Sequence, residues 1–423
     1  MNRPRVTPGP ALALTAVWAV SRALMLWLLT HSGAHLLGGG SVTREVWRLY
    51  VHWYGVLGHG AFPAHDTSWQ YPPGAGVVLL APGLLPWLTY FQAFVVLTLA
   101  ADALVVRALV RAGGRPGRSL LGAAVWTAGL PLLLHLPLAR YDVQVTALAV
   151  LSLLTLARSP RAGGVFGALG TLVKVWPALV LLGTPRGRTT RTAWTWAAAS
   201  GAAVLALLAV SFDHSFAFLR EQGGRGVQIE SLGGTALNLA RHAGWHGRAR
   251  YQYGSIELTG PHVAAVAVAS LALTAAAFGL LLLWRLRARH WSEATPFDAA
   301  LSAVLLFTVT SRVISPQYMI WLLGLASVCL TSRCTSQRPV AALVLAASAL
   351  STVAFPMYYS QVVDGTWTGC LLMLARNGLL AAAAGLSFVR LWRSALPPAG
   401  KSVAAKEPRP DSDRLQDRAL SVS

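Results

Sequence analysis

Residues 262–289 read HVAAVAVASLALTAAAFGLLLLWRLRAR, a long apolar run that ends at a cluster of three arginines. An α-helix needs about 20 apolar residues to cross the hydrocarbon core of a bilayer, and this run is long enough. Arginines that follow such a run favour the cytoplasmic side of the membrane. The stretch therefore predicts a membrane-spanning helix whose C-terminal end lies in the cytoplasm.

The same pattern recurs along the whole chain of 423 residues, of which 55% are hydrophobic and only 12% are charged. A soluble domain carries about 25% charged residues, so the composition favours a membrane protein. We expect membrane-spanning helices in ten apolar runs: 11–30, 91–110, 119–136, 142–158, 192–212, 262–284, 297–311, 316–332, 339–356 and 367–389. The first run follows Arg3 and Arg5, which is typical of an uncleaved signal anchor.

The formal net charge of +20 comes almost entirely from arginine. In a soluble protein this charge would suggest a nucleic-acid partner, but here the arginines lie between apolar runs and indicate topology, so no nucleic acid is expected. Both chain ends are expected in the cytoplasm, together with these clusters: Arg107/Arg111/Arg115/Arg118, Arg158/Arg161, Arg186/Arg188/Arg191, Arg285/Arg287/Arg289, Arg333/Arg338 and Arg390/Arg393. The three cysteines lack the spacing of a metal or disulfide framework, and we predict no metal and no other cofactor.

Two further apolar stretches, 74–87 and 163–183, contain proline and glycine, and the second has Lys174 near its middle. We expect them to be re-entrant or broken segments, which are tolerated where protein or a cavity surrounds them. A Pro-kinked helix is an equal alternative for 163–183. The expected fold class is therefore all-α: a polytopic membrane protein with about 10–12 transmembrane helices. Residues 1–395 should form one membrane-embedded domain and 396–423 a disordered cytoplasmic tail.

This topology places five segments on the outward face: 31–73, 136–142, 213–261, 311–317 and 356–366. Most of the scarce acidic residues fall there, which suggests that any chemistry takes place at the outer surface, although avoidance of the basic inner loops explains part of the skew. The segment 213–261 is expected to be a polar loop. Its stretch around Arg225 and Glu230 fits either a solvated loop or a lid over a cavity.

The first outer loop is the richest in chemical groups. Residues 41–57 predict an amphipathic helix at the membrane interface, with Glu45 and His52 on its polar stripe and Trp53 on its apolar side. Asp66 follows, and then comes the sequence WQYPPG at 69–74. The paired prolines stop a helix, and they fit either a rigid turn at the membrane boundary or the wall of a substrate cavity.

Four cations lie at or inside apolar segments: Arg22, Arg140, Lys174 and Arg312. Each needs a partner or a wet cavity, because an ionisable group inside a bilayer costs about 2.5–3.5 kcal/mol. Arginine suits a phosphate ligand because its planar fork donates two hydrogen bonds. A snorkelling side chain with a local partner, such as Arg140 with Asp142, is the alternative.

Five motifs occur in a characteristic order: GHGAFPAHDTSWQYPPGAG at 58–76, LARYDVQVTAL at 138–148, LVKVWPALVLL at 172–182, RGVQIES at 225–231 and SRVISPQYMIWLL at 311–323. Together with the N-terminal span and the acidic residue of the first outer loop, this set resembles the actinobacterial polyprenol-phosphate-mannose-dependent mannosyltransferases of the GT-C superfamily. The resemblance runs from about residue 11 to residue 390.

The resemblance implies a GT-C-like fold in the plasma membrane and an active site on the extracytoplasmic face. It implies transfer of a hexose, usually mannose, from a polyprenyl-phosphate donor to a lipid or glycan acceptor. Such enzymes carry an essential acidic residue, usually aspartate, in the first outer loop. Glu45 occupies the matching position here, followed by Val46 and Tyr50 in the expected pattern, so this chain departs from the family by one methylene.

A carboxylate can take the proton of an acceptor hydroxyl, and cations can neutralise the leaving phosphate, so inverting single displacement is the expected mechanism. The expected catalytic residue is Glu45, with Asp66 supporting or competing with it. The expected donor-phosphate ligands are Arg140, Arg312, Arg225 and Lys174. The expected lining of the substrate cavity comprises Tyr50, His52, His65, Trp69, Tyr71, Asp142, Glu230, Gln317 and Tyr318.

A lipid or sugar transporter without catalysis is the main alternative. A transporter of this size predicts internal repeats and functional charges near the middle of the membrane. No repeat is obvious in the sequence, and most acidic residues fall toward one surface. A purely structural or regulatory membrane protein, the third possibility, would not need Glu45, Asp66, Arg140 and Arg312 to converge.

Overall fold

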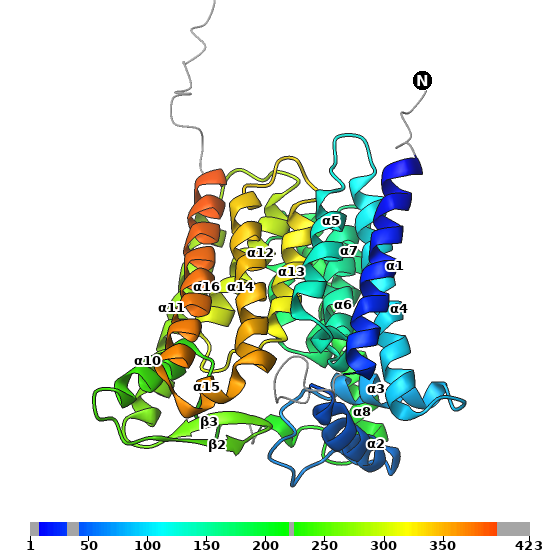
Figure 1. The fold of residues 1–423 in the computed structure, drawn as a ribbon. Coiled ribbons are helices and arrows are strands. Elements are labelled where there is room, and N and C mark those ends of the chain that lie inside the picture. Colours follow the sequence, from blue (N-terminus) through cyan, green and yellow to red (C-terminus); the bar gives the residue numbers. More distant parts are fainter. Residues whose placement is uncertain (1–7, 32–41, 220–223, 396–423) are drawn as a thin grey trace, which may run out of the picture.

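The computed structural model describes residues 8–31, 42–219 and 224–395. Figure 1 shows helices packed side by side in a bundle, with the first and last described helices beginning and ending at its upper end. A thinner layer of short helices and strands covers the lower end. The expected tail at 396–423 and part of the first outer loop lie outside the described residues.

Six helices of the described chain are long and apolar enough to cross a membrane. Many of their apolar side chains lie on the surface of the bundle: only 11% of the α8 window and 22% of the α11 window are buried. A surface this apolar is stable against lipid rather than water. The six helices are α1 (Pro8–Thr30), α4 (Tyr90–Gly113), α8 (Arg188–Ser211), α11 (Val263–Arg287), α14 (Arg338–Thr352, continued to Met357 by a π-helical turn) and α16 (Trp367–Ser394).

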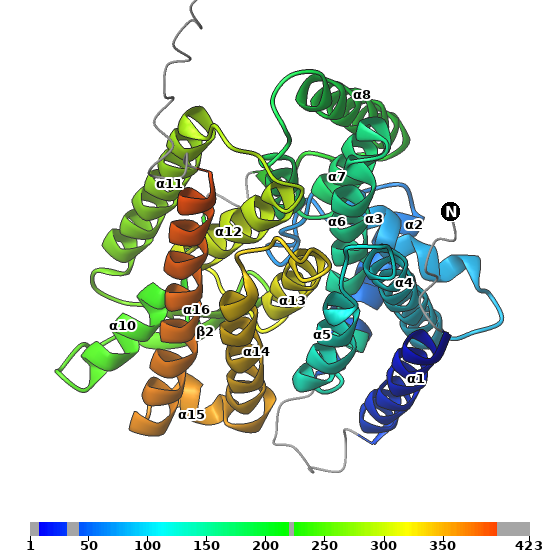
Figure 2. The same ribbon diagram turned by 90° about the horizontal axis from the view of Figure 1, so that it is seen from above.

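The remaining apolar runs form shorter helices: α3 (Gly74–Leu80), α5 (Leu121–Gly129), α6 (Asp142–Leu156), α7 (Pro160–Val173), α12 (Thr295–Thr310) and α13 (Tyr318–Cys329). All ten predicted runs are helical, which confirms an all-α polytopic membrane protein. The difference lies in length, because proline, glycine and polar residues divide several runs before they reach 20 residues. Seen from above, α13 lies among α5, α6, α12 and α14 (Figure 2), and it is buried on every side.

The prediction that 74–87 and 163–183 are broken is confirmed. Helix α3 gives way to a 3-10 turn over Ala81–Leu84, which contains Pro82. Helix α7 ends at Lys174, whose extended backbone (φ −146°, ψ 143°) precedes a 3-10 segment over Trp176–Leu181. The interruption places the Lys174 side chain at a gap in the helical backbone rather than on a helix face.

The lower layer contains a small sheet that the sequence analysis missed, so the expectation of a loop across 213–261 is wrong. Strands β1 (Val227–Gln228), β2 (Arg248–Gln252) and β3 (Ser255–Thr259) form an antiparallel sheet in the order β1-β3-β2. Residues Tyr253 and Gly254 turn the β2–β3 hairpin, both with positive φ, as a tight hairpin turn requires. The same layer holds the π-helix η2 (Val46–Tyr50), α2 (Val51–Gly58), α10 (Leu232–Arg241) and α15 (Tyr359–Asp364).

Helices α4 and α16, which carry Arg111 and Arg393 in their last turns, end at the upper end of the bundle, opposite this layer (Figure 1). Arg118 forms an ion pair with Glu293 at 2.9 Å, and its carbonyl oxygen accepts a hydrogen bond from Arg333. Arg390 likewise donates to the carbonyl oxygen of Ser336 at 3.1 Å. These contacts join loops that the sequence predicts on one side of the membrane.

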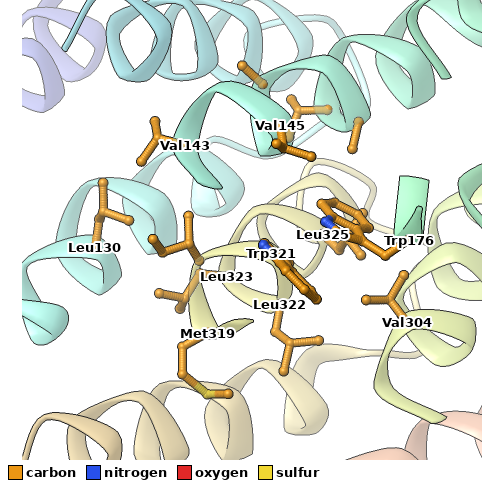
Figure 3. Close-up of a cluster of buried hydrophobic side chains, with 14 of the residues drawn as sticks. Leu130, Val143, Val145, Trp176, Val304, Met319, Trp321, Leu322, Leu323 and Leu325 are labelled. Atoms are coloured by element: carbon orange, nitrogen blue, oxygen red, sulfur yellow. The ribbon is translucent and has the colours of Figure 1, made fainter. Parts of the chain in front are cut away.

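The interior is apolar except for a few paired charges. Figure 3 shows part of the main core, where Leu323 of α13 lies near Leu130 and Trp321 faces Trp176. Arg22 of α1 is buried and pairs with Asp102 of α4 at 2.8 Å, while Trp18 and Trp126 also donate to that carboxylate. Arg22 therefore satisfies its charge inside the bundle and does not snorkel to an interface.

Candidate active site

Glu45 lies at the start of η2 in the lower layer, and Arg140 anchors it. The Nη2 atom of Arg140 lies 2.7 Å from Oε2 of Glu45, and the hydroxyl of Tyr50 donates to Oε1 at 3.3 Å. Arg140 is itself held by the carbonyl oxygens of Val42 and Ala139, at 3.0 and 2.8 Å. The alternative in which Arg140 pairs with Asp142 is wrong, and Glu45 is fixed by a buried guanidinium.

A cavity of about 340 Å³ opens beside Glu45, between the lower layer and the bundle. Residues from four segments line it: the proline turn before α3, the break after α7, the segment before β1 and the loop between α12 and α13. Seven of the predicted site residues line it: Glu45, Tyr71, Lys174, Arg225, Arg312, Gln317 and Tyr318. We refer to it as the main cavity.

Lys174 reaches the main cavity from the break in 163–183. Its Nζ lies 2.6 Å from Oδ1 of Asp142, and the indole of Trp321 donates to the same oxygen at 2.6 Å. The ammonium also lies over the Tyr141 ring, 4.7 Å from its centroid. Asp142 is only 1% exposed and does not line the main cavity, so the cation faces the cavity with its carboxylate partner behind it.

Arg225 has the same arrangement. Its Nε lies 3.0 Å from Oε1 of Glu257 on β3, whose other oxygen accepts the backbone N–H of Gly226. Glu257 is 1% exposed and does not line the main cavity. Arg312 donates to the carbonyl oxygen of Arg225 at 2.7 Å. Burial, and then the nearby charge of Arg225, lower the pKa of Arg312 from its usual value.

Three cations thus line the main cavity while two of their carboxylate partners stay buried outside it. This arrangement presents positive charge to a ligand at little cost to the fold, since the buried carboxylates stabilise the cations. Lysine and arginine in such an array suit a phosphate group. The three positively charged side chains of the main cavity therefore favour an anionic ligand.

An aromatic wall faces the same space. Tyr318 and Trp321 stack with ring centroids 3.8 Å apart, and Trp176 stacks on Trp321 at 5.2 Å. Figure 3 shows the two indoles facing one another between α13 and the 3-10 segment after Lys174. Flat aromatic faces of this kind, with the polar Gln317 beside them, suit the apolar face of a sugar ring.

The other predicted site residues do not line the main cavity. Asp66 accepts hydrogen bonds from the Trp53 indole at 2.7 Å and from the backbone N–H and hydroxyl of Ser68. Burial raises the pKa of Asp66, but these hydrogen bonds outweigh it and the net shift is downward. Trp69 is buried against Trp53, while His52 on α2 and His65 in the Asp66 loop are exposed.

Glu230 is buried at the end of β1, where the sequence analysis expected a cavity residue. Its carboxylate lies 3.2 Å from Nη2 of Arg376 on α16, and Arg376 and Asn377 also donate to its carbonyl oxygen. Burial raises the pKa of Glu230 to about 7, although Arg376 and a hydrogen bond with Gln228 act in the opposite direction. Glu230 therefore joins the lower layer to α16.

Sequence reasoning missed several residues of the site, above all Glu257, Trp176 and Trp321. Trp321 follows Tyr318 by one helical turn, a spacing that could have identified the stack. Nothing in the local sequence distinguishes Glu257 from the other acidic residues of its segment. Among the described residues, no three His, Cys, Asp or Glu side chains gather as a metal site would require.

Fold and site together define a membrane protein with a cationic, aromatic cavity at one end of its helical bundle. The chain matches Glycosyltransferase family 87 over residues 69–316, more than half of its length. It belongs to this family, and it is a membrane glycosyltransferase. The matched range includes Arg140, Lys174, Arg225 and Arg312 and begins after Glu45. A comparison with curated proteins finds no match.

Proposed function

We propose that this glycosyltransferase transfers a hexose, in the first place mannose, from a polyprenyl-phosphate donor to a lipid or glycan acceptor. The observation that carries the proposal is the position of Glu45: an anchored carboxylate in the wall of a cavity that Lys174, Arg225 and Arg312 also line. A glycosyl donor with a phosphate leaving group needs this combination of one base and several cations.

The reaction is a single displacement. A carboxylate oxygen of Glu45 takes the proton of the acceptor hydroxyl as its oxygen attacks the anomeric carbon. The bond between that carbon and the phosphate oxygen breaks, and the electron pair leaves with the polyprenyl phosphate. Lys174, Arg225 and Arg312 stabilise the negative charge on the departing phosphate. Attack from the opposite face inverts the anomeric centre, as in inverting glycosidases that use one carboxylate base.

The apolar part of the main cavity supports a lipid-linked donor. Phe218, Leu271 of α11 and Phe307 of α12 also line this cavity. Leu271 is 53% exposed, on a helix whose surface suits lipid. A polyprenyl chain can leave the cavity past these apolar side chains while the phosphate stays beside the cations. Contact with them is favourable, because it removes the apolar isoprenoid units from water.

The proposed location is the plasma membrane, with the lower layer and the main cavity on the extracytoplasmic face. The arginine clusters at the opposite end support this orientation, because arginine-rich ends of membrane helices favour the cytoplasm. The acceptor then meets the enzyme at the outer surface of the membrane.

The test is transfer of radiolabelled hexose from polyprenyl-phosphate-mannose by the purified full chain in lipid nanodiscs. Glu45→Gln should lower kcat at least a hundredfold, because it removes the base but keeps the shape of the side chain. Glu45→Asp should retain part of the activity. Asp364→Asn, which removes an exposed carboxylate of the lower layer, should match the wild type.

Two outcomes would overturn the proposal. Full activity in Glu45→Gln would remove Glu45 from the chemistry. Failure of the wild type to transfer mannose to any lipid or glycan acceptor would reject the proposed donor.

A further inference from the structure

Asp142 is a buried carboxylate behind the main cavity, and one of its oxygens contacts two residues of the cavity wall. Nζ of Lys174 and Nε1 of Trp321 each lie 2.6 Å from Oδ1 of Asp142. Lys174 follows α7 and Trp321 lies on α13, while Asp142 is the first residue of α6. Asp142 is 1% exposed and does not line the main cavity. It therefore joins two cavity residues from separate elements without lining the cavity itself.

Lys174 provides the cationic end of this arrangement. An ammonium group has three N–H donors, and in the part of the chain that the structure describes no acceptor other than Asp142 contacts Nζ. The other neighbours of Nζ are aromatic: the ring centroids of Tyr141, Trp321 and Tyr71 lie 4.7, 5.2 and 5.8 Å from it. Aromatic faces attract a cation, but they do not replace an oxygen acceptor. Two donors of Lys174 can therefore bind a phosphate oxygen in the main cavity.

Trp321 provides the aromatic end. Its ring stacks with Tyr318 at 3.8 Å and with Trp176 at 5.2 Å between centroids, and all three rings line the main cavity. Figure 3 shows the indoles of Trp321 and Trp176 facing one another. The hydrogen bond from the Trp321 indole to Asp142 fixes this stack relative to Lys174. Because flat aromatic rings suit the apolar face of a sugar, the stack can hold a hexose at a set distance from the ammonium.

We propose that Asp142 is a positioning residue of the donor site: it holds the phosphate-binding Lys174 and the hexose-binding stack of Trp321 at a fixed separation. This inference rests on the proposed function and deepens it, because it divides the donor site into a phosphate subsite and a hexose subsite. The hexose and the phosphate of the donor are joined by the bond that breaks in the reaction. Fixed subsites hold that bond in one place, and a displacement of about 1 Å can slow an enzyme about a hundredfold.

A binding experiment tests the two subsites without requiring transfer. The full chain in phosphatidylcholine nanodiscs is titrated with a short-chain polyprenyl-phosphate-mannose and with the matching polyprenyl methyl phosphate. Both ligands are phosphodiesters with one negative charge, and they differ in the hexose. The Kd of the methyl ester measures the phosphate subsite, and the ratio of the two Kd values measures the hexose subsite. The wild type should prefer the mannosylated ligand about tenfold, a factor that contact with an aromatic stack can supply.

Single variants separate the two contacts of Asp142. Trp321→Phe keeps an aromatic ring but loses the indole N–H, so it should lose most of the mannose preference and still bind the methyl ester. Lys174→Met should weaken both ligands about tenfold and keep the preference, because Trp321 still donates to Asp142. Asp142→Leu should weaken both ligands and lose the preference. Asp142→Asn keeps an oxygen for the Trp321 indole but carries no charge, so it should weaken both ligands and retain the preference.

Paired double variants distinguish positioning from a loss of stability. Lys174→Met/Asp142→Leu leaves no buried charge unpaired at this site, so it should be more stable than Lys174→Met and yet lose the mannose preference that Lys174→Met keeps. The matched control is Arg22→Leu/Asp102→Leu. Asp102 is also buried, pairs with Arg22 at 2.8 Å and accepts two tryptophan indole N–H groups, but it does not line the main cavity. This control should bind both ligands as the wild type does.

A wild-type mannose preference in Trp321→Phe or in Lys174→Met/Asp142→Leu would overturn the proposal, because both variants break the contact between Asp142 and the stack. Loss of the preference in the control would also overturn it, since that would indicate a general loss of packing. Equal binding of the two ligands by the wild type would reject the hexose subsite. If the wild type binds both ligands no more tightly than an uncharged polyprenol, the proposed donor fails, and the proposed function fails with it.

Discussion

The Nη2 atom of Arg140 and the Oε2 atom of Glu45, 2.7 Å apart, join the end of a short 3-10 turn to the first helix of the lower layer. Arg140 is buried and also binds two carbonyl oxygens, so its guanidinium is rigid. The carboxylate of Glu45, the proposed base, is thus oriented by Arg140, which does not line the main cavity.

Replacing Arg140 should therefore impair catalysis more than donor binding. Arg140→Gln should lower kcat about ten- to a hundredfold, because Glu45 loses its orientation. Arg140→Lys should recover only part of the rate, since an ammonium cannot reproduce the fork that contacts Val42, Ala139 and Glu45 together. Steady-state kinetics in nanodiscs measure both effects, with circular dichroism as the control for folding. A rise in donor KM with unchanged kcat would contradict the positioning role.

Arg312 and Lys174 should act on the donor instead. Arg312→Gln removes a cation from the main cavity and should raise the KM for the polyprenyl-phosphate donor about tenfold, a factor that one charge-assisted hydrogen bond can supply. Lys174→Met should have a larger effect, because it also leaves Asp142 buried without its cation. The KM for the acceptor should stay the same in both variants, and a parallel rise in both KM values would argue against separate sites.

The sequence was sufficient for much of the architecture. Hydropathy identified every long helix, and the lysine inside 163–183 marked the break that delivers Lys174 to the main cavity. The cost of a charge in an apolar segment also singled out Arg312, whereas the family resemblance singled out Glu45, and all three residues line that cavity. These successes depend on one-dimensional signals: the apolar length of a helix and the cost of an ionisable group inside it.

Hydropathy and charge placement do not predict which acidic residue pairs with which cation. Glu230 follows Arg225 closely in the sequence and was expected in the cavity, but strand β1 lies between them. Antiparallel pairing sets Gln228 opposite Glu257, which brings Glu257 and not Glu230 to Arg225. The register of a two-residue strand depends on tertiary contacts, and a five-residue strand with little alternation gives no periodic signal.

The buried pair of Arg22 and Asp102 should matter for stability and not for chemistry. Asp102→Leu leaves a guanidinium unpaired inside the bundle and should lower the free energy of unfolding by about 3–5 kcal/mol. Arg22→Leu/Asp102→Leu should recover most of this loss, because no charge then remains buried. Thermal unfolding in detergent, followed by tryptophan fluorescence, measures the difference. A double variant as unstable as the single one would show that the apolar replacement does not pack.

Glu230 should make stability depend on pH near neutrality. Its pKa is about 7 in the folded protein because burial disfavours the charged form, against an ordinary value of 4.5 that the unfolded chain should regain. Between these values the folded protein holds a proton that the unfolded chain has released. Stability due to this group is therefore fully present below about pH 4.5 and is lost as the pH rises through about 7.

Glu230→Gln keeps the shape of the side chain but cannot titrate, so it isolates this dependence. The introduced amide resembles the protonated carboxyl group of Glu230 beside Arg376, and the variant should match the wild type most closely near pH 5. As the pH rises to 8, the melting temperature of the wild type should fall relative to that of the variant. Thermal unfolding at pH 5, 6, 7 and 8 gives the two profiles. Parallel profiles would mean that Glu230 is already ionised at pH 5 and that its ion pair with Arg376 outweighs the cost of burial.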